Sequence, residues 1–165
     1  MSALVSIAKL DASTARIVMP RIGAWHLDAV LLASEGVAVG DRVSVSIGGG
    51  AWTLSGTATQ ARAFEDALRV RVVAGAAGLG TTAPAKFYKG AARSLVLGDL
   101  LTRSGEARSS TTDAAFLAEL LPAWSTFARP CGTEIGTLVT TGSALAWRTL
   151  SDGTITAYSI DGAGT

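Results

Sequence analysis

The 165-residue sequence predicts an α+β fold, an antiparallel β-barrel or sandwich with two or three short helices and a C-terminal β-hairpin. In the first half, apolar and polar residues alternate in short runs, which is the period of a strand. After residue 84, two segments place apolar residues at helical spacing instead. Near the end, Asp152-Gly153 separates two β-rich runs. This pair is typical of a hairpin because glycine adopts a positive φ without steric cost.

We expect residues 1–84 to form a strand-rich barrel portion, and residues 85–165 to form the helices and the closing hairpin, packed as one unit with the first. Alternating runs in the first portion predict five or six short strands, at residues 5–10, 16–19, 24–32, 43–47, 52–56 and 68–73. Glycines 48–50 indicate a turn between two of them. The bulky side chains of Trp25 and Trp52 are expected in the core.

The first helix is predicted over residues 94–104, because Gly105 follows it in the position of a C-terminal cap. A second helix is expected to begin at Ser110 or Thr111, and Pro122 must kink or end it. Its apolar stripe has helical spacing and consists of Phe116, Leu117, Leu120, Leu121 and Trp124.

A weaker pattern predicts a third helix over residues 133–141, and the closing hairpin occupies residues 145–158. The glycine-rich segment 75–84 follows a strand and invites comparison with a phosphate-binding loop. Its G-x-x-G-x-G spacing reverses the dinucleotide fingerprint, and Pro84 prevents a helix from following directly. We interpret this segment as a loop or boundary.

Composition limits the classes of partner. The net charge is +1, so no large electrostatic field attracts nucleic acid or an anionic membrane, and no apolar run approaches the length of about 20 residues that crosses a bilayer. The charged fraction of 16% lies below the usual value of about 25%, and the mean hydropathy is +0.39. Either a partner subunit covers apolar surface, or alanine and glycine raise the index without forming a patch. The single cysteine, Cys131, is expected to be a buried thiol.

The sequence predicts no catalytic, cofactor-binding or metal-binding residue. His26 and Asp28 share a strand face, but a triad also needs a positioned nucleophile and no G-x-S-x-G elbow exists. One histidine and one cysteine cannot build a structural zinc site. A carboxylate pair for glycoside hydrolysis meets only in three dimensions, but a solvated helix face explains the main candidates, Asp99, Glu106 and Glu119.

Arg69 and Arg71 alternate with Leu68, Val70 and Val72, so the two arginines lie on the face opposite the apolar residues. That face is either exposed to solvent or covered by a partner. Arg69 and Arg71 are therefore candidates for a subunit interface or for the lumen of an assembly, and an ordinary solvated strand face explains them equally well. A sheet edge left unpaired in one subunit can also be closed by a neighbour.

Four segments of the second half occur in a characteristic order: Lys86–Tyr88, Ala92–Glu106, Leu117–Trp124 and Ala146–Thr154. In their order along the chain and their general residue pattern, they resemble the baseplate hub, or tail hub, proteins of tailed bacteriophages. The resemblance implies tail-tube-like β-barrel domains with helices, and a homo-oligomer, a trimer, that joins the tail tube to the central spike. It also implies a lumen through which DNA passes transiently, and a location in the virion tail or baseplate after assembly in the bacterial cytoplasm.

Two other functions stay open at this point. One is a cell-wall hydrolase of the same machine, which would use a carboxylate cluster or a site at His26. The other is a monomeric barrel that binds an oligosaccharide or nucleic acid. The sequence favours a structural, non-enzymatic protein without a cofactor, because it offers no catalytic constellation.

Overall fold

The computed structural model describes residues 4–159. The chain forms two compact units. The first contains the chain up to Ala77 together with Ser151–Gly153, and the second contains Gly78–Leu150 and the segment from Thr154 onward. The described part is mostly β, with three short α-helices and a C-terminal strand pair, as the sequence predicts.

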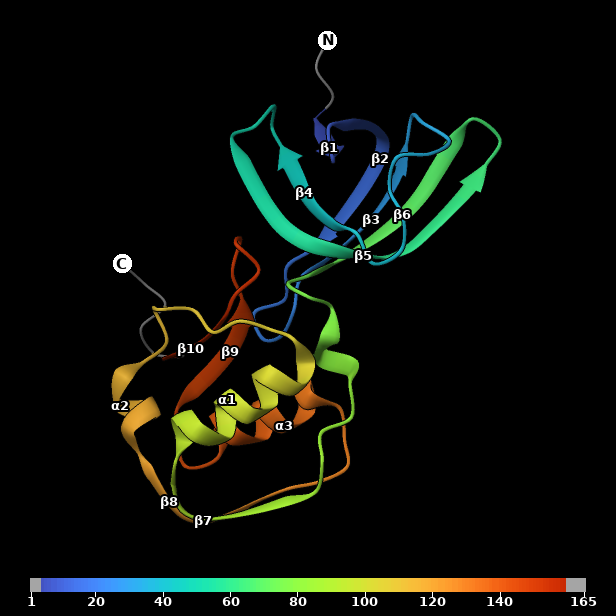
Figure 1. The fold of residues 1–165 in the computed structure, drawn as a ribbon. Helices are drawn as coiled ribbons and strands as arrows, with labels where there is room; N and C mark the ends of the chain where they lie inside the picture. Colours follow the sequence, from blue (N-terminus) through green and yellow to red (C-terminus); the bar gives the residue numbers. More distant parts are fainter. Residues whose placement is uncertain (1–3, 160–165) are drawn as a thin grey trace. The chain divides into compact units, whose positions relative to one another are not determined.

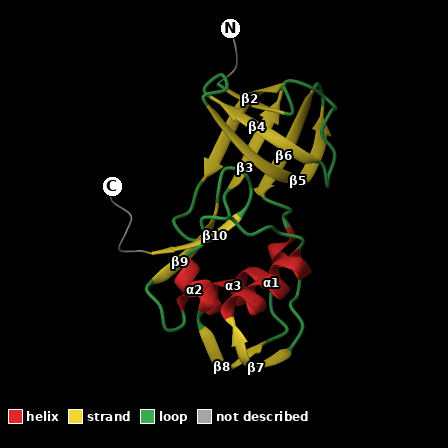
Figure 2. Cartoon of the chain, turned by 60° about the vertical axis from the view of Figure 1, so that its left-hand side comes forward, coloured by secondary structure: helices red, strands yellow, loops and turns green. Residues whose placement is uncertain are grey.

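The first unit is a closed antiparallel barrel (Figures 1 and 2). Its strands follow the order β1-β2-β3-β6-β5-β4, and β1 pairs with β4 to close the ring. The prediction of a barrel or sandwich is therefore resolved in favour of a barrel, and the barrel leaves no unpaired edge for a neighbour to close. The strands are β1 (Val5–Ile7), β2 (Leu10–Val18), β3 (His26–Leu31), β4 (Arg42–Ile47), β5 (Trp52–Phe64) and β6 (Ala67–Ala74).

The barrel interior is filled by side chains that alternate inward along the strands. Leu27 lies opposite Val72 and Ile17 in the ladders, and all three belong to the core or pack against it. A six-stranded barrel is narrower than the eight-stranded barrels whose interior just accommodates side chains. Ten residues of the barrel core are at most 1% exposed, namely Ile7, Trp25, Leu27, Leu31, Val45, Leu54, Ala58, Val70, Val72 and Ala74.

The two tryptophans of the barrel differ from each other. Trp25 is 1% exposed, as predicted, and its ring lies against Gly56, where an added Cβ would come within 2.9 Å of it. The prediction for Trp52 is wrong, because this residue is 64% exposed. Trp52 has the inward parity of Leu54, but it is the first residue of β5, next to the turn at Gly48–Gly50, and pairs with Ile47 at the last position of β4.

The second unit packs helices with two short sheets. Its elements are η1 (Gly78–Gly80), β7 (Lys86–Ala92), α1 (Arg93–Ser104), α2 (Ala114–Ala118), β8 (Leu120–Thr126), α3 (Cys131–Thr140), β9 (Leu145–Thr149) and β10 (Ile155–Ser159). Val96, Leu97 and Leu100 of α1 share a core with Ile135 and Leu138 of α3. The predictions of helices over 94–104 and 133–141 are confirmed, and Gly105 caps α1 with a φ of 69°.

The second predicted helix is much shorter than expected. Asp113 is its N-cap and accepts a hydrogen bond of 2.7 Å from the backbone N–H of Phe116. The helix ends before Glu119, and the stripe residues Leu120, Leu121 and Trp124 belong to β8 instead. Pairing with β7, which the sequence did not predict, decides this outcome.

The closing hairpin is confirmed, with a three-residue loop in place of a two-residue turn. Thr149 pairs with Ile155, and the N–H of Leu150 donates to the carbonyl of Thr154 at 2.8 Å. Gly153 has a φ of 84°, which fits the left-handed residue of a three-residue hairpin loop.

Candidate interaction surface

Arg69 and Arg71 point outward from β6, because Leu68, Val70 and Val72 fill the interior. Residues opposite each other in an antiparallel ladder share one face of the sheet. Arg71 lies opposite Asp28 of β3 and Gln60 of β5, and Arg69 lies opposite Arg62 of β5. The predicted candidates are thus part of a wider polar surface.

We call this surface the arginine row, defined as Arg16, Arg62, Arg69 and Arg71 with Asp28. Arg16 of β2 lies opposite Asp28 on the other side of β3, so basic side chains flank one carboxylate. The Nε atom of Arg71 lies 3.6 Å from Oδ1 of Asp28. A shallow hollow of about 490 Å³ runs over the row, lined by residues that include all of its members except Arg62.

The arginine row stays positively charged despite the ion pair between Arg71 and Asp28. An exposed ion pair contributes little, about 0–1 kcal/mol, and the side chains of Arg71 and Asp28 are 40% and 50% exposed. The row therefore contains four guanidinium groups and a single carboxylate, although the whole chain has a net charge of only +1.

Asp28 meets Arg71 across the ladder, so the His26–Asp28 pair considered from the sequence is not an isolated acid-base pair. His26 begins β3 on the same face, opposite Val18 and Val73. Cys131 is buried, as the sequence predicts, and burial raises the pKa of its thiol. A thiol with a raised pKa is a poor nucleophile at neutral pH.

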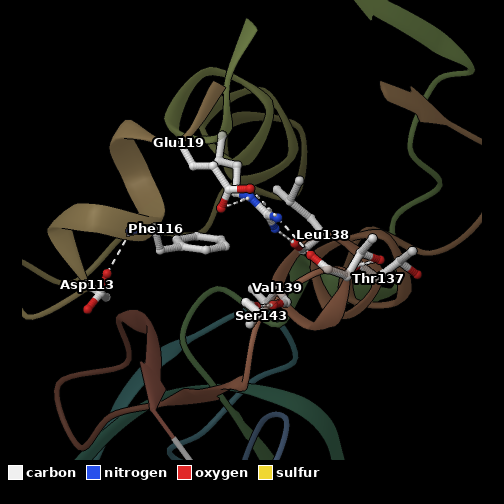
Figure 3. A network of polar contacts seen from close by, with 9 residues as sticks. Asp113, Phe116, Glu119, Thr137, Leu138, Val139 and Ser143 are labelled. Carbon is white, nitrogen blue, oxygen red and sulfur yellow. Dashed lines mark hydrogen bonds and ion pairs between the residues drawn. The ribbon is translucent and has the colours of Figure 1, made fainter. Parts of the chain in front are cut away.

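Arg93 forms a buried polar cluster in the second unit. Its neighbours Glu119, Leu138 and Phe116 are labelled in Figure 3. Its side chain is 2% exposed, and its Nε lies 3.0 Å from Oε2 of Glu119. The guanidinium also donates to the carbonyls of Leu138 and Thr141 at the end of α3, and it lies 5.2 Å from the ring centre of Phe116. These contacts satisfy carbonyls that a helix leaves unpaired at its C-terminus and place a cation at the negative end of the dipole.

A second polar cluster joins Lys86, Tyr88 and Asp99. Lys86 Nζ lies 2.5 Å from Asp99 Oδ2, and the Tyr88 hydroxyl donates to the same oxygen at 2.9 Å. The hydrogen bond from Lys86 lowers the pKa of Asp99, and the same bond raises the pKa of Lys86. Burial, followed by the hydrogen bond to Asp99, raises the pKa of Tyr88.

Two more acidic residues of this unit, Glu134 and Glu106, are also engaged. Oε1 of Glu134, whose side chain is fully buried in α3, accepts a hydrogen bond of 2.6 Å from Nε of Arg129. Oε1 of Glu106 accepts a bond of 2.9 Å from the N–H of Gly78. Sequence reasoning missed both pairs: Arg93 and Glu119 are 26 positions apart and meet only through the fold, whereas Arg129 and Glu134 are five positions apart at the start of α3.

Within residues 4–159, His, Cys, Asp and Glu side chains do not gather in any group of three or more that could hold a metal ion. The same described residues include no helix with the length and apolarity to span a membrane.

Comparison with known proteins gives no match by sequence: no protein-family profile and no curated protein matches the chain. Solved structures do match. The 43 kDa tail protein of prophage MuSo2 from Shewanella oneidensis aligns with a TM-score of 0.62 at 12% identity, over 94% of this chain and 54% of that one. A tail protein from Neisseria meningitidis MC58 aligns with a TM-score of 0.64 at 14% identity, over 95% and 50%.

The c3393 protein of E. coli aligns with a TM-score of 0.67 at 13% identity, over 98% of this chain and 50% of that one. It is described as a component of the type VI secretion system with structural similarity to the T4 bacteriophage tail proteins gp27 and gp5. This chain has the fold of phage tail proteins. It spans about half the length of the proteins that it matches. The likeness confirms the fold that the resemblance to tail hub proteins implied.

Proposed function

We propose that this protein is a structural component of a phage tail or a related injection machine, a hub or adaptor that joins the tail tube to the central spike. The observation that carries the proposal is that one fold covers 94% to 98% of this chain in three proteins described as tail or type VI secretion components. Both units of the chain, barrel and helical, take part in this likeness.

The carboxylates weighed as hydrolase candidates support a non-enzymatic role. Asp99 binds Lys86 and Tyr88, Glu119 binds Arg93, and Glu106 binds the backbone of Gly78. Each contact ties its carboxylate to a neighbouring element. The packed barrel interior also disfavours a barrel that holds a ligand inside.

In the proposed role, copies of the chain form a homo-oligomer, a trimer, that leaves a lumen for transient passage of DNA. Tail tube and spike proteins are the expected partners, and the virion tail or baseplate is the expected location after assembly in the bacterial cytoplasm. Arg69 and Arg71 belong to a subunit interface or to the lumen in this proposal, and their outward position is compatible with either.

Antibody labelling tests this role directly. We expect antibodies against the chain to label one end of tail particles in electron micrographs of lysates from the bacterium that encodes it. Label confined to soluble protein, with purified tails unlabelled, would contradict the proposal. A peptidoglycan-release assay checks the alternative: turnover that disappears in Glu106→Gln would identify a hydrolase.

A further inference from the structure

The arginine row is a surface that is compatible with an acidic partner. Its members lie on adjacent strands β2, β3, β6 and β5, in register and on the outer face of the barrel. Arg16, Arg62 and Arg69 are exposed, and the one carboxylate, Asp28, is shared between two arginine positions. The hollow above the row gives room for side chains of another molecule.

The same barrel carries a surface of opposite charge, which we call the acidic end: residues 32–41, between β3 and β4, and residues 63–67, at the β5–β6 turn. Figure 1 shows these segments beside each other, and residues of both line one hollow of about 540 Å³. Every charged residue in the two segments is acidic: Glu35, Asp41, Glu65 and Asp66.

The acidic end also exposes large apolar side chains. Leu32, Val39 and Phe64 are 68%, 64% and 71% exposed. Apolar groups framed by polar residues are typical of a protein interface. Their presence favours a protein as the occupant over nucleic acid, which would leave them uncovered.

Symmetry then restricts how two copies can meet. A twofold dimer centred on the row would place four arginines against four arginines, which would repel each other. A contact between two different patches avoids this repulsion, and such head-to-tail contacts form a closed ring when the rotation between neighbouring copies closes. We infer that the arginine row of one copy binds the acidic end of a second copy. This inference rests on the proposed function, because it specifies the surfaces through which the homo-oligomer forms.

Charge exchange tests the inference. The variant Arg69→Glu/Arg71→Glu is expected to raise the dissociation constant of self-association at low salt by at least about tenfold, and so is Glu65→Arg/Asp66→Arg. The variant that carries all four changes restores opposite charges between the exchanged residues, so we expect it to recover at least part of the association that each double variant loses. Light scattering after chromatography and sedimentation velocity provide the measurements, and circular dichroism checks that each variant is folded.

The matched control is Lys89→Glu/Arg108→Glu. It changes the net charge as much as the first variant but affects exposed residues of the second unit. We expect its association to match that of the wild type. An equal loss in this control would show that net charge alone acts, and would overturn the inference.

The remaining outcomes separate the inference from the proposed function. If the wild type forms an oligomer and both double variants leave it intact, the inference is overturned and the proposed function stands. A wild type that stays monomeric at every concentration and salt contradicts both the inference and the proposed homo-oligomer. If Arg69→Glu/Arg71→Glu abolishes binding to a duplex oligonucleotide without affecting assembly, the row binds nucleic acid and the inference is wrong.

Discussion

The barrel and the helical unit are stabilised by different means. The barrel buries apolar side chains in a closed ladder that pairs its own backbone groups. The helical unit buries three charged residues as well, Arg93 at 2%, Glu106 at 8% and Glu134 at 0% exposure. Short helices leave carbonyls and N–H groups unpaired at their ends, and side chains must satisfy them. The stability of the helical unit therefore depends on individual polar side chains. The stability of the barrel depends instead on the alternation of buried and exposed residues along its strands.

Replacing Arg93 should have the largest effect. We expect Arg93→Ala to lower the free energy of unfolding of the helical unit by about 4 kcal/mol, because Glu119 and the carbonyls at the end of α3 lose their partner. Urea unfolding followed by the helical circular dichroism signal measures this change. Arg148→Ala is the control, at an exposed arginine of β9 that lies 4.8 Å from the ring centre of Tyr158, and it should cost no more than about 1 kcal/mol. Equal midpoints for the two variants would contradict the role of Arg93.

An apolar truncation tests the barrel in the same way. Leu27→Ala removes a side chain that is 0% exposed, and we expect a loss of about 3 kcal/mol from lost burial and the remaining cavity. Fluorescence of Trp25, which is buried in the same core, reports the transition. Leu32→Ala, at a residue that is 68% exposed, is the matched control with an expected cost below about 0.5 kcal/mol. A large loss in the control would overturn this account.

Two glycines, one inside α1 and one at its C-terminal cap, should have smaller and opposite effects on stability. Gly105 has a φ of 69° and its N–H bonds to carbonyls of Leu101 and Thr102, so Gly105→Ala should cost about 1 kcal/mol. Gly98 lies inside the helix, and an added Cβ would have no neighbour within 4 Å. Gly98→Ala should therefore stabilise the helix by up to about 1 kcal/mol. Thermal unfolding should shift in opposite directions for the two variants, and shifts of the same sign would contradict the cap.

The dependence on pH is expected to be the smallest effect, and it should come from the helical unit. The pKa of Asp99 lies below its ordinary value of 3.8, so its contribution is present above that value and is lost as the pH falls through the lowered pKa. The pKa values of Cys131, Tyr88 and Lys86 lie above their ordinary values of 9.0, 10.0 and 10.5. Their contributions are present below those values and are lost as the pH rises through the raised ones.

Asp99→Asn isolates the acidic limb of this profile. As the pH falls from neutral through the pKa of Asp99, we expect the free energy of unfolding to decrease less in the variant than in the wild type. The reason is that the variant lacks the carboxylate that must be protonated. Urea midpoints measured across the pH range provide the readout. Superimposable acid profiles for the variant and the wild type would show that Asp99 contributes nothing there.

The sequence predicted the barrel better than the helical unit, for a physical reason. Period-two alternation holds along Leu27 to Leu31 and along Leu68 to Val72, because one face of each strand is buried. The stripe from Phe116 to Trp124 fits a helix by spacing, but the chain extends after Glu119 to pair with β7, and local spacing contains no information about that pairing. The exposure of Trp52 depends likewise on its place at the barrel end.

The sequence predicted only part of the arginine row. Alternation placed Arg69 and Arg71 outward, but the ladder register was needed to bring Arg16, Arg62 and Asp28 beside them. The buried pair of Arg93 and Glu119 joins residues 26 positions apart, and no local pattern indicates it.

The pairing of β1 with β4 has a consequence for the protein before it meets any partner. A barrel with this seam closed offers no row of free N–H and C=O groups on which another chain could add a strand. Newly made copies can then accumulate to high concentration without their barrels forming fibrils. The three residues Val5–Ile7, which close the seam, thereby protect the barrel against strand-to-strand association.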